Sequence, residues 1–173
     1  MKRLTLLAAL VVLLIGASAG AAQAVTDFDN APSGAHYRQG YSEPTCDIDQ
    51  TATAITVDCT GTQIGGVGNT NATLLLTVDA TANFVCHNPG NHNVVEPHSD
   101  SVSDDTSDTI RPDRNGTLVV DPKSVTLSSQ EAADQFTCPN RRWREEFVGF
   151  SNVSYTYSLT FAGFSEPAIL ITG

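Results

Sequence analysis

A regular alternation of apolar and polar residues at positions 72–86 limits the folds open to this chain more than any other feature. All eight even positions are apolar, and five of the seven odd positions are polar. A repeat of two residues is typical of a β-strand that buries one face and exposes the other to water. The apolar face is formed by Ala72, Leu74, Leu76, Val78, Ala80, Ala82, Phe84 and Cys86. The pattern therefore predicts one long, half-buried strand.

A second alternation lies near the end of the chain. Between positions 153 and 161 the odd positions are apolar or aromatic, and Ser or Thr occupies the even positions. Because each of the two strands presents an apolar face, we expect them to line one core. The residues predicted to be buried in that core are Leu74, Leu76, Val78, Tyr155 and Leu159.

Shorter elements flank these two strands. The sequence predicts strands at 54–59, 116–120, 124–127, 143–150 and 168–171. A capping box at 128–131 predicts a short helix near 129–136. Strand character is weak in the Ser- and Asp-rich run at 99–108.

Seven or eight short strands separated by turn residues, together with one small helix, predict an all-β fold. The predicted class is an immunoglobulin-like antiparallel β-sandwich that forms a single domain at 46–173. A β-barrel is the main alternative. Residues 25–45 contain prolines and glycines with little periodicity, so we expect an irregular N-terminal arm before the sandwich.

Residues 1–24 have the features of a secretory signal peptide. Lys2 and Arg3 supply a charged start, and residues 4–15 are uncharged and apolar. The small-residue sequence Ala22-Gln23-Ala24 matches a cleavage site. The leader predicts a secreted, extracellular protein. No later stretch reaches the roughly 18–20 consecutive apolar residues of a transmembrane helix, so no transmembrane segment is expected in the mature form.

The charge balance restricts the class of partner. Removal of Lys2 and Arg3 with the leader leaves seven basic against 19 acidic residues, a formal charge of −12. Such a surface argues against nucleic acid or an anionic membrane as partner. The expected partner of this exported chain is an unknown extracellular partner or a cell-surface component.

All four cysteines lie after the leader, which favours two disulfides in an exported chain. Three connectivities are open from sequence alone. The favoured pairing is Cys46 with Cys59 and Cys86 with Cys138. The first bridge would close a local hairpin, and the second would tie the middle of the chain to the late strands.

A further pattern combines Phe84-Val85-Cys86-His87-Asn88-Pro89-Gly90-Asn91 with a later Cys138-Pro139-Asn140 and Trp143. It resembles a family of small secreted all-β proteins, of actinobacterial or halophile type, with a Cys-x-Asn-Pro-Gly segment and a late Cys-Pro-Asn near a Trp. The likeness covers residues 51–161. It implies the all-β fold and the pairing of Cys86 with Cys138. The family has no assigned activity, so no functional residue is transferred.

The cluster of Cys86, His87, His92 and His98 raises the question of a metal site. Cupredoxins, which are also secreted β-sandwiches, present a Cys and a His to copper in such a loop. A blue-copper site usually adds an axial Met, and the only Met of this chain is Met1, in the leader. We therefore expect no metal and no cofactor. The alternative is a secreted metal-dependent redox protein or enzyme that uses the His87–His98 loop.

A cluster of aspartates in the run at 99–108 is the next candidate for a metal site. Asp100, Asp104, Asp105 and Asp108 lack the spacing of an EF-hand, and they favour a solvated acidic edge strand over a calcium site.

The neighbouring carboxylates Glu145 and Glu146 point to opposite faces of a strand and cannot flank one glycosidic bond. Arg141, Arg142 and Arg144 lie beside them in the sequence. This arrangement predicts local ion pairs rather than a pair of catalytic carboxylates.

Three sequences match the acceptor pattern for N-glycosylation, at Asn71, Asn115 and Asn152. No arrangement of residues typical of a catalytic site stands out. The preferred interpretation is a non-enzymatic, secreted structural, adhesive or binding module.

Overall fold

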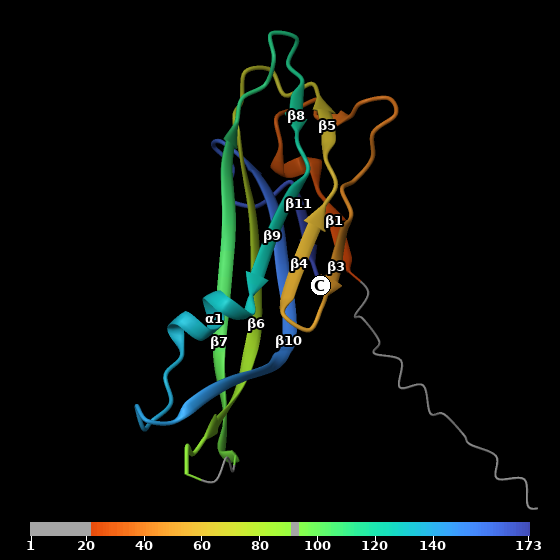
Figure 1. Ribbon diagram of the computed structural model, residues 1–173. Coiled ribbons are helices and arrows are strands. Elements are labelled where there is room, and N and C mark those ends of the chain that lie inside the picture. Colours follow the sequence, from red (N-terminus) through yellow and green to blue (C-terminus); the bar gives the residue numbers. More distant parts are fainter. Residues whose placement is uncertain (1–21, 91–93) are drawn as a thin grey trace, which may run out of the picture.

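The computed structural model describes residues 22–90 and 94–173, which form a mostly β structure with antiparallel sheets (Figure 1). The strands are β1 (Gln23–Thr26), β2 (His36–Tyr37), β3 (Cys46–Gln50), β4 (Ala54–Cys59), β5 (Thr62–Gly65), β6 (Ala72–His87), β7 (Val94–Ile110), β8 (Leu118–Val120), β9 (Lys123–Ser128), β10 (Arg144–Phe161) and β11 (Ile169–Thr172). The helical elements are the 3-10 turn η1 (Phe28–Asn30) and the helix α1 (Ser129–Gln135).

The largest sheet has five strands in the order β1-β11-β10-β6-β7. Its central ladders join β6 to β10 on one side and to β7 on the other, both antiparallel and both along nearly the full length of β6. The alternation at 72–86 therefore predicted β6 correctly to within one residue. With two long neighbours, nearly every backbone amide and carbonyl of β6 has a ladder partner.

The inner face of this sheet forms the core. Leu74, Leu76, Val78 and Leu159 have no exposed surface, and Tyr155 is also buried, which confirms the five residues predicted for the core. Burial of a side chain of this size stabilises a protein by about 1.5–3 kcal/mol. The two alternating segments thus supply much of the hydrophobic free energy of folding.

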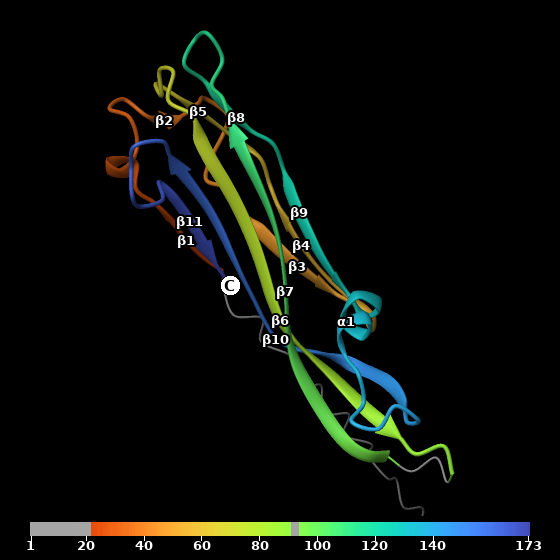
Figure 2. The ribbon, with the colours of Figure 1, turned by 90° about the vertical axis from the view of Figure 1, so that its left-hand side faces the viewer.

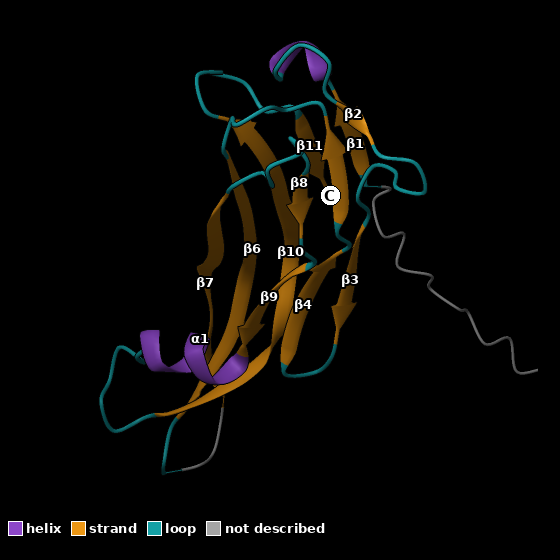
Figure 3. Cartoon of the chain, turned by 90° about the horizontal axis from the view of Figure 1, so that it is seen from above, coloured by secondary structure: helices purple, strands orange, loops and turns teal. Residues whose placement is uncertain are grey.

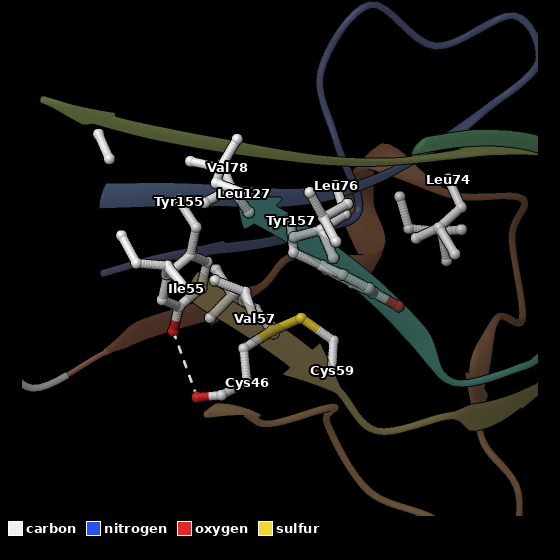
Figure 4. Close-up of a cluster of buried hydrophobic side chains, with 14 of the residues drawn as sticks. Cys46, Ile55, Val57, Cys59, Leu74, Leu76, Val78, Leu127, Tyr155 and Tyr157 are labelled. Carbon is white, nitrogen blue, oxygen red and sulfur yellow. Dashed lines mark hydrogen bonds between the residues drawn. A yellow bond between two sulfur atoms is a disulfide. The ribbon is translucent and has the colours of Figure 1, made fainter. Parts of the chain in front are cut away.

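A second sheet, in the order β3-β4-β9, faces the inner side of the first (Figures 2 and 3). Ile55 and Val57 of β4 are fully buried between the two sheets (Figure 4). The hydroxyl of Tyr155 donates a hydrogen bond of 3.4 Å to the carbonyl oxygen of Cys46, which links the sheets directly. Cys46 and Cys59 are opposite each other on β3 and β4 and form a disulfide, as the favoured pairing predicted.

Residues 25–45, expected to be irregular, contain three short ordered elements. β1 pairs with β11, β2 pairs with β5, and the Asp27 side chain caps η1. Strands of two to four residues are too short to show a hydrophobic period, which explains why the sequence pattern did not reveal them. The close approach of this segment to the loop after β5 needs glycine, because a Cβ atom at Gly66 would lie 2.0 Å from the carbonyl oxygen of Gly34.

The two strands predicted at 143–150 and 153–161 are one strand, β10, interrupted by irregularities in its pairing with β6. Register shifts lie between Phe147 and Gly149 and between Ser151 and Ser154. Asn152 has a φ of 50°, a left-handed conformation that Asn tolerates better than most residues. A bulge bends a strand without ending its ladder, so the break in the pattern does not end the strand.

The weak strand signal at 99–108 was misleading, because β7 is a strand of 17 residues. Its pairing with β6 imposes the extended conformation on a Ser- and Asp-rich sequence with little hydrophobic pattern. β7 lies at the edge of the five-stranded sheet, which confirms the predicted acidic edge strand. Asp108 forms an ion pair with Lys123 of β9.

The helix predicted near 129–136 is α1. Its N-cap residue Ser128 and Glu131 form the capping box that the sequence predicted. The side chain of Ser128 accepts a hydrogen bond from the amide of Glu131, at 3.2 Å. Among the described residues, no helix has the length and apolar character needed to span a membrane.

The central position of Leu76 gives a first test. We expect Leu76→Ala to lower the free energy of unfolding by about 2–5 kcal/mol, because the side chain has no exposed surface and its loss leaves a cavity. Leu75→Ala, on the half-buried outer face of the same strand, is the matched control and should cost about 1 kcal/mol. Urea unfolding with intact disulfides measures both. Equal losses in the two variants would contradict the assigned faces of β6.

Tyr157 makes the stability sensitive to high pH. Burial raises the pKa of its hydroxyl above the usual value near 10, and Tyr37 adds to this rise. The unfolded chain therefore loses this proton first, so the contribution of Tyr157 is complete below about pH 10 and declines as the pH rises further. We expect Tyr157→Phe to make the fall in unfolding free energy between about pH 10 and 12 shallower. Tyr41→Phe, at an exposed position, is the matched substitution. An unchanged pH profile in Tyr157→Phe would contradict this assignment.

Candidate functional site

The end of the long strands projects beyond the second sheet (Figures 1 and 2). We call this region the distal tip and define it as residues 84–90 and 136–147. It contains the end of β6, the start of β10 and the loop that follows α1. Residues 91–93, between β6 and β7, lie outside the described part of the chain. Loops carried at the end of a rigid sheet are frequent sites of binding.

An aromatic cluster supports the tip where the second sheet ends. Phe136, just after α1, stacks on Phe84 of β6 with a centroid separation of 4.3 Å. Phe147 meets Phe84 edge to face, and Phe150 packs in the same way against Phe147. Contacts of this kind add about 0.5–1.5 kcal/mol each to the burial of the rings. The cluster fixes the loop after α1 onto the ends of β6 and β10.

The disulfide between Cys86 and Cys138 ties the same loop to β6 covalently. The two Cα atoms are 6.0 Å apart, and both residues are buried. This is the second bridge of the favoured pairing. Since the sulfur of Cys86 is bonded to carbon and sulfur, it offers no thiolate to a metal, which removes the central ligand of the copper interpretation.

The histidines considered as metal ligands do not converge. His98 lies on β7 rather than in a loop, opposite Phe84, and its ring centroid is 5.7 Å from that of Phe136. His87 is three residues beyond Phe84 and thus faces the other side of the sheet. Its Nε2 lies 2.9 Å from Oε2 of Glu146. His92 lies outside the described residues.

Within residues 22–90 and 94–173, no three His, Cys, Asp or Glu side chains are grouped so that they could hold one metal ion.

The loop before β10 is held by Asn140. Its side-chain oxygen accepts a hydrogen bond of 3.0 Å from the amide of Arg142, and its carbonyl oxygen accepts one of 2.8 Å from the amide of Trp143. Arg144 then enters the β10 ladder opposite His87. The backbone of this segment therefore has a defined turn between the disulfide and the strand.

Three arginine side chains in this segment lack acidic partners among the described residues. The predicted ion pairs of Arg141, Arg142 and Arg144 with the adjacent glutamates are not formed, and Glu146 pairs with His87 instead. The reason is the cross-strand register, which places Glu146 opposite Val85 on the face where His87 also lies. All three guanidinium groups belong to exposed residues.

Two adjacent hollows open at the distal tip. The first is lined by Thr137, Cys138, Asn140, Arg141, Trp143, Arg144 and Glu145. The second is lined by His87, Asn88, Pro89, Arg144 and Glu146. Arg144 lines both hollows. The register places Arg144 opposite His87 and Glu145 opposite Cys86, so the two hollows flank the start of β10 from different faces of the sheet. Trp143 is the only tryptophan of the chain and is half-buried in this arrangement.

Another hollow lies between the edge of β7 and α1, and its lining includes Asp104, Leu127 and Glu131. Glu131 is already engaged in the capping box of α1, where its Oε2 accepts a hydrogen bond of 2.7 Å from the hydroxyl of Ser128. Two of its polar lining residues, Ser128 and Glu131, are therefore already bonded to each other.

The three glycosylation acceptor sites lie outside the distal tip. Asn115 and Asn152 are exposed, whereas Asn71 is half-buried just before β6. Asn152 sits in the irregular part of β10, and its side-chain amide donates to Thr81 over 3.3 Å. Use of these sites stays a prediction.

Comparisons with models of protein families, with curated proteins and with solved structures find no match to this chain. The functional interpretation therefore depends on the residues of the distal tip. The sequence pattern did not predict that Arg141, Trp143 and Arg144 line one hollow. The available signal was the clustering of these residues in the sequence. Four consecutive positions, 141–144, hold three of the seven basic residues after the leader and the only tryptophan.

The Cys86–Cys138 bridge can be tested through Trp143. In Cys86→Ala/Cys138→Ala we expect a red shift of native-state tryptophan emission, because the loop that holds Trp143 loses its covalent anchor. The free energy of unfolding should fall by about 4 kcal/mol from the lost closure of a 52-residue separation.

The matched control is Cys46→Ala/Cys59→Ala, which removes the other bridge. It should cost about 3 kcal/mol for its 13-residue separation and leave native emission unchanged. Identical emission spectra in both variants would show that the Cys86–Cys138 bridge does not order the tip.

Proposed function

We propose that this protein is a secreted, non-enzymatic module with an immunoglobulin-like β-sandwich fold that binds an extracellular partner or cell-surface component through its distal tip. The two facing sheets support the fold assignment. The signal-peptide pattern and the two disulfides support secretion. The resemblance to small secreted all-β proteins points the same way and stays a prediction.

The observation that favours binding is the clustering of three exposed arginines without acidic partners at the distal tip. After loss of the leader the chain has 19 acidic and seven basic residues, and within the described residues only Lys123 among the seven forms an ion pair. Arg38, Arg111 and Arg114 also lack ion pairs there, so what distinguishes the tip is that Arg141, Arg142 and Arg144 lie within four positions, beside Trp143. A local positive region on an otherwise acidic protein attracts anionic groups of a partner.

The alternative, a metal-dependent redox protein or enzyme using the His87–His98 loop, has less support. Cys86 is engaged in a disulfide, and His87 and His98 lie on opposite faces of the sheet. A single ion would need both side chains on one side.

Retention on a sulfonate cation exchanger tests the proposed binding surface. At about 0.1 M salt the Debye length is about 10 Å, so distant carboxylates are largely screened and a local positive region dominates the contact. We expect the mature protein to be retained at pH 7 despite its formal charge of −12. Arg141→Ala/Arg142→Ala should elute in the unbound fraction.

The control is Arg111→Ala/Arg114→Ala, which removes the same charge from exposed positions between β7 and β8, at the opposite end of the molecule (Figure 1). This variant should be retained like the wild type. An unretained wild type, or equal losses in both variants, would reject the distal tip as an anion-attracting surface.

A further inference from the structure

We infer that the two hollows of the distal tip bind a carboxylated oligosaccharide, a segment of an acidic polysaccharide. This inference rests on the proposed binding function and assigns its ligand class. The lining of the first hollow includes Trp143 and two arginines, Arg141 and Arg144. An indole offers a flat apolar surface to the C–H face of a sugar ring. A guanidinium group pairs with a carboxylate through two parallel hydrogen bonds.

The remaining lining of the first hollow suits hydroxyl groups. Thr137 and Asn140 provide both donors and acceptors, and Glu145 provides acceptors only. The hydroxyls of a sugar can donate to Glu145 while the sugar carboxylate lies against an arginine. A ligand without hydroxyl donors, such as polyphosphate, would have nothing to donate to Glu145 and would be repelled by it. The mixture of charges therefore favours a polyhydroxylated anion over a densely charged one.

The shared position of Arg144 favours an oligomer over a single sugar. Arg144 lines both hollows, and the second hollow again combines an arginine with a glutamate, Glu146. A chain of two or three sugar units that passes around the start of β10 could enter both hollows with one carboxylate near Arg144. The arrangement thus matches an oligomer whose units carry both carboxylate and hydroxyl groups.

The site is also organised before binding. The Cys86–Cys138 bridge anchors one end of the loop, Asn140 holds the turn, and Trp143 is half-buried. Side chains already held in place lose less conformational entropy when a ligand binds. For a flexible, polar oligosaccharide, this smaller loss of conformational entropy contributes more to affinity than the buried area does.

The direct test is titration of the mature protein with trigalacturonate, followed by calorimetry and by the emission of Trp143. We expect saturable 1:1 binding with a change in emission, and no binding of maltotriose, a neutral trisaccharide. Trp143→Ala and Arg144→Gln should each weaken binding at least tenfold. Arg144→Lys should also weaken it, because an ammonium group cannot replace the bidentate contact. Arg111→Ala/Arg114→Ala should bind like the wild type.

Thermal unfolding of each variant establishes that it is folded, and calorimetry provides the readout where Trp143 has been removed. If trigalacturonate does not bind while the wild type is still retained on the cation exchanger, the sugar assignment fails and the binding surface stands. If both fail, the proposed function fails too.

Other ligand classes give distinct results. Pyrophosphate or a polyglutamate peptide that binds as tightly as trigalacturonate, with no effect of Trp143→Ala, would overturn the sugar assignment in favour of a general anion surface. Concentration-dependent dimerisation in sedimentation, lost in Arg141→Ala/Arg142→Ala, would assign the tip to the acidic surface of a second copy and also overturn it.

Discussion

The antiparallel ladders that β6 forms with β10 and β7 are the interaction on which the rest of the structure depends. They pair nearly every residue of β6 on both sides. One half of this three-stranded ribbon supplies the inner face that the second sheet covers. The other half continues past that sheet and supports the distal tip. Core and candidate site therefore share one continuous hydrogen-bonded scaffold, so their relative position is fixed by the sheet and not by a flexible connection.

Where the three long strands extend beyond the second sheet, aromatic residues cover the apolar inner face. Beyond the second sheet the inner face would meet water, yet Phe84 is almost completely buried there. α1 turns the chain back so that Phe136 covers Phe84, and Cys138 follows two residues later to bond with Cys86. The loop that bears the arginines thus belongs to the segment that covers the end of β6. The same aromatic contact and disulfide that stabilise this end of the sheet also hold the loop in place.

The sequence was sufficient where local pattern and tertiary structure agree. The alternation predicted β6 and the buried residues, the capping box predicted α1, and the favoured cysteine pairing is the one observed. β7 could not be predicted in the same way, because its extended conformation comes from pairing with β6 and not from its own residues. The prediction that the arginines pair with the adjacent glutamates was wrong for a related reason. The register that brings Glu146 to His87 is a property of two strands distant in sequence.

The distribution of charge over the sheet connects the fold to the proposed function. An edge strand of 17 residues invites pairing with another chain through its free backbone groups. On β7, Asp100, Asp104 and Asp108 are opposite inner-face residues of β6 yet remain exposed, which is an arrangement that opposes such pairing. With sheet extension disfavoured along β7, contact with a partner shifts to side-chain recognition. The distal tip is where the same scaffold presents three clustered arginines without an acidic partner among the described residues. In the proposed function, the acidic edge strand limits self-association and the distal tip binds an anionic partner.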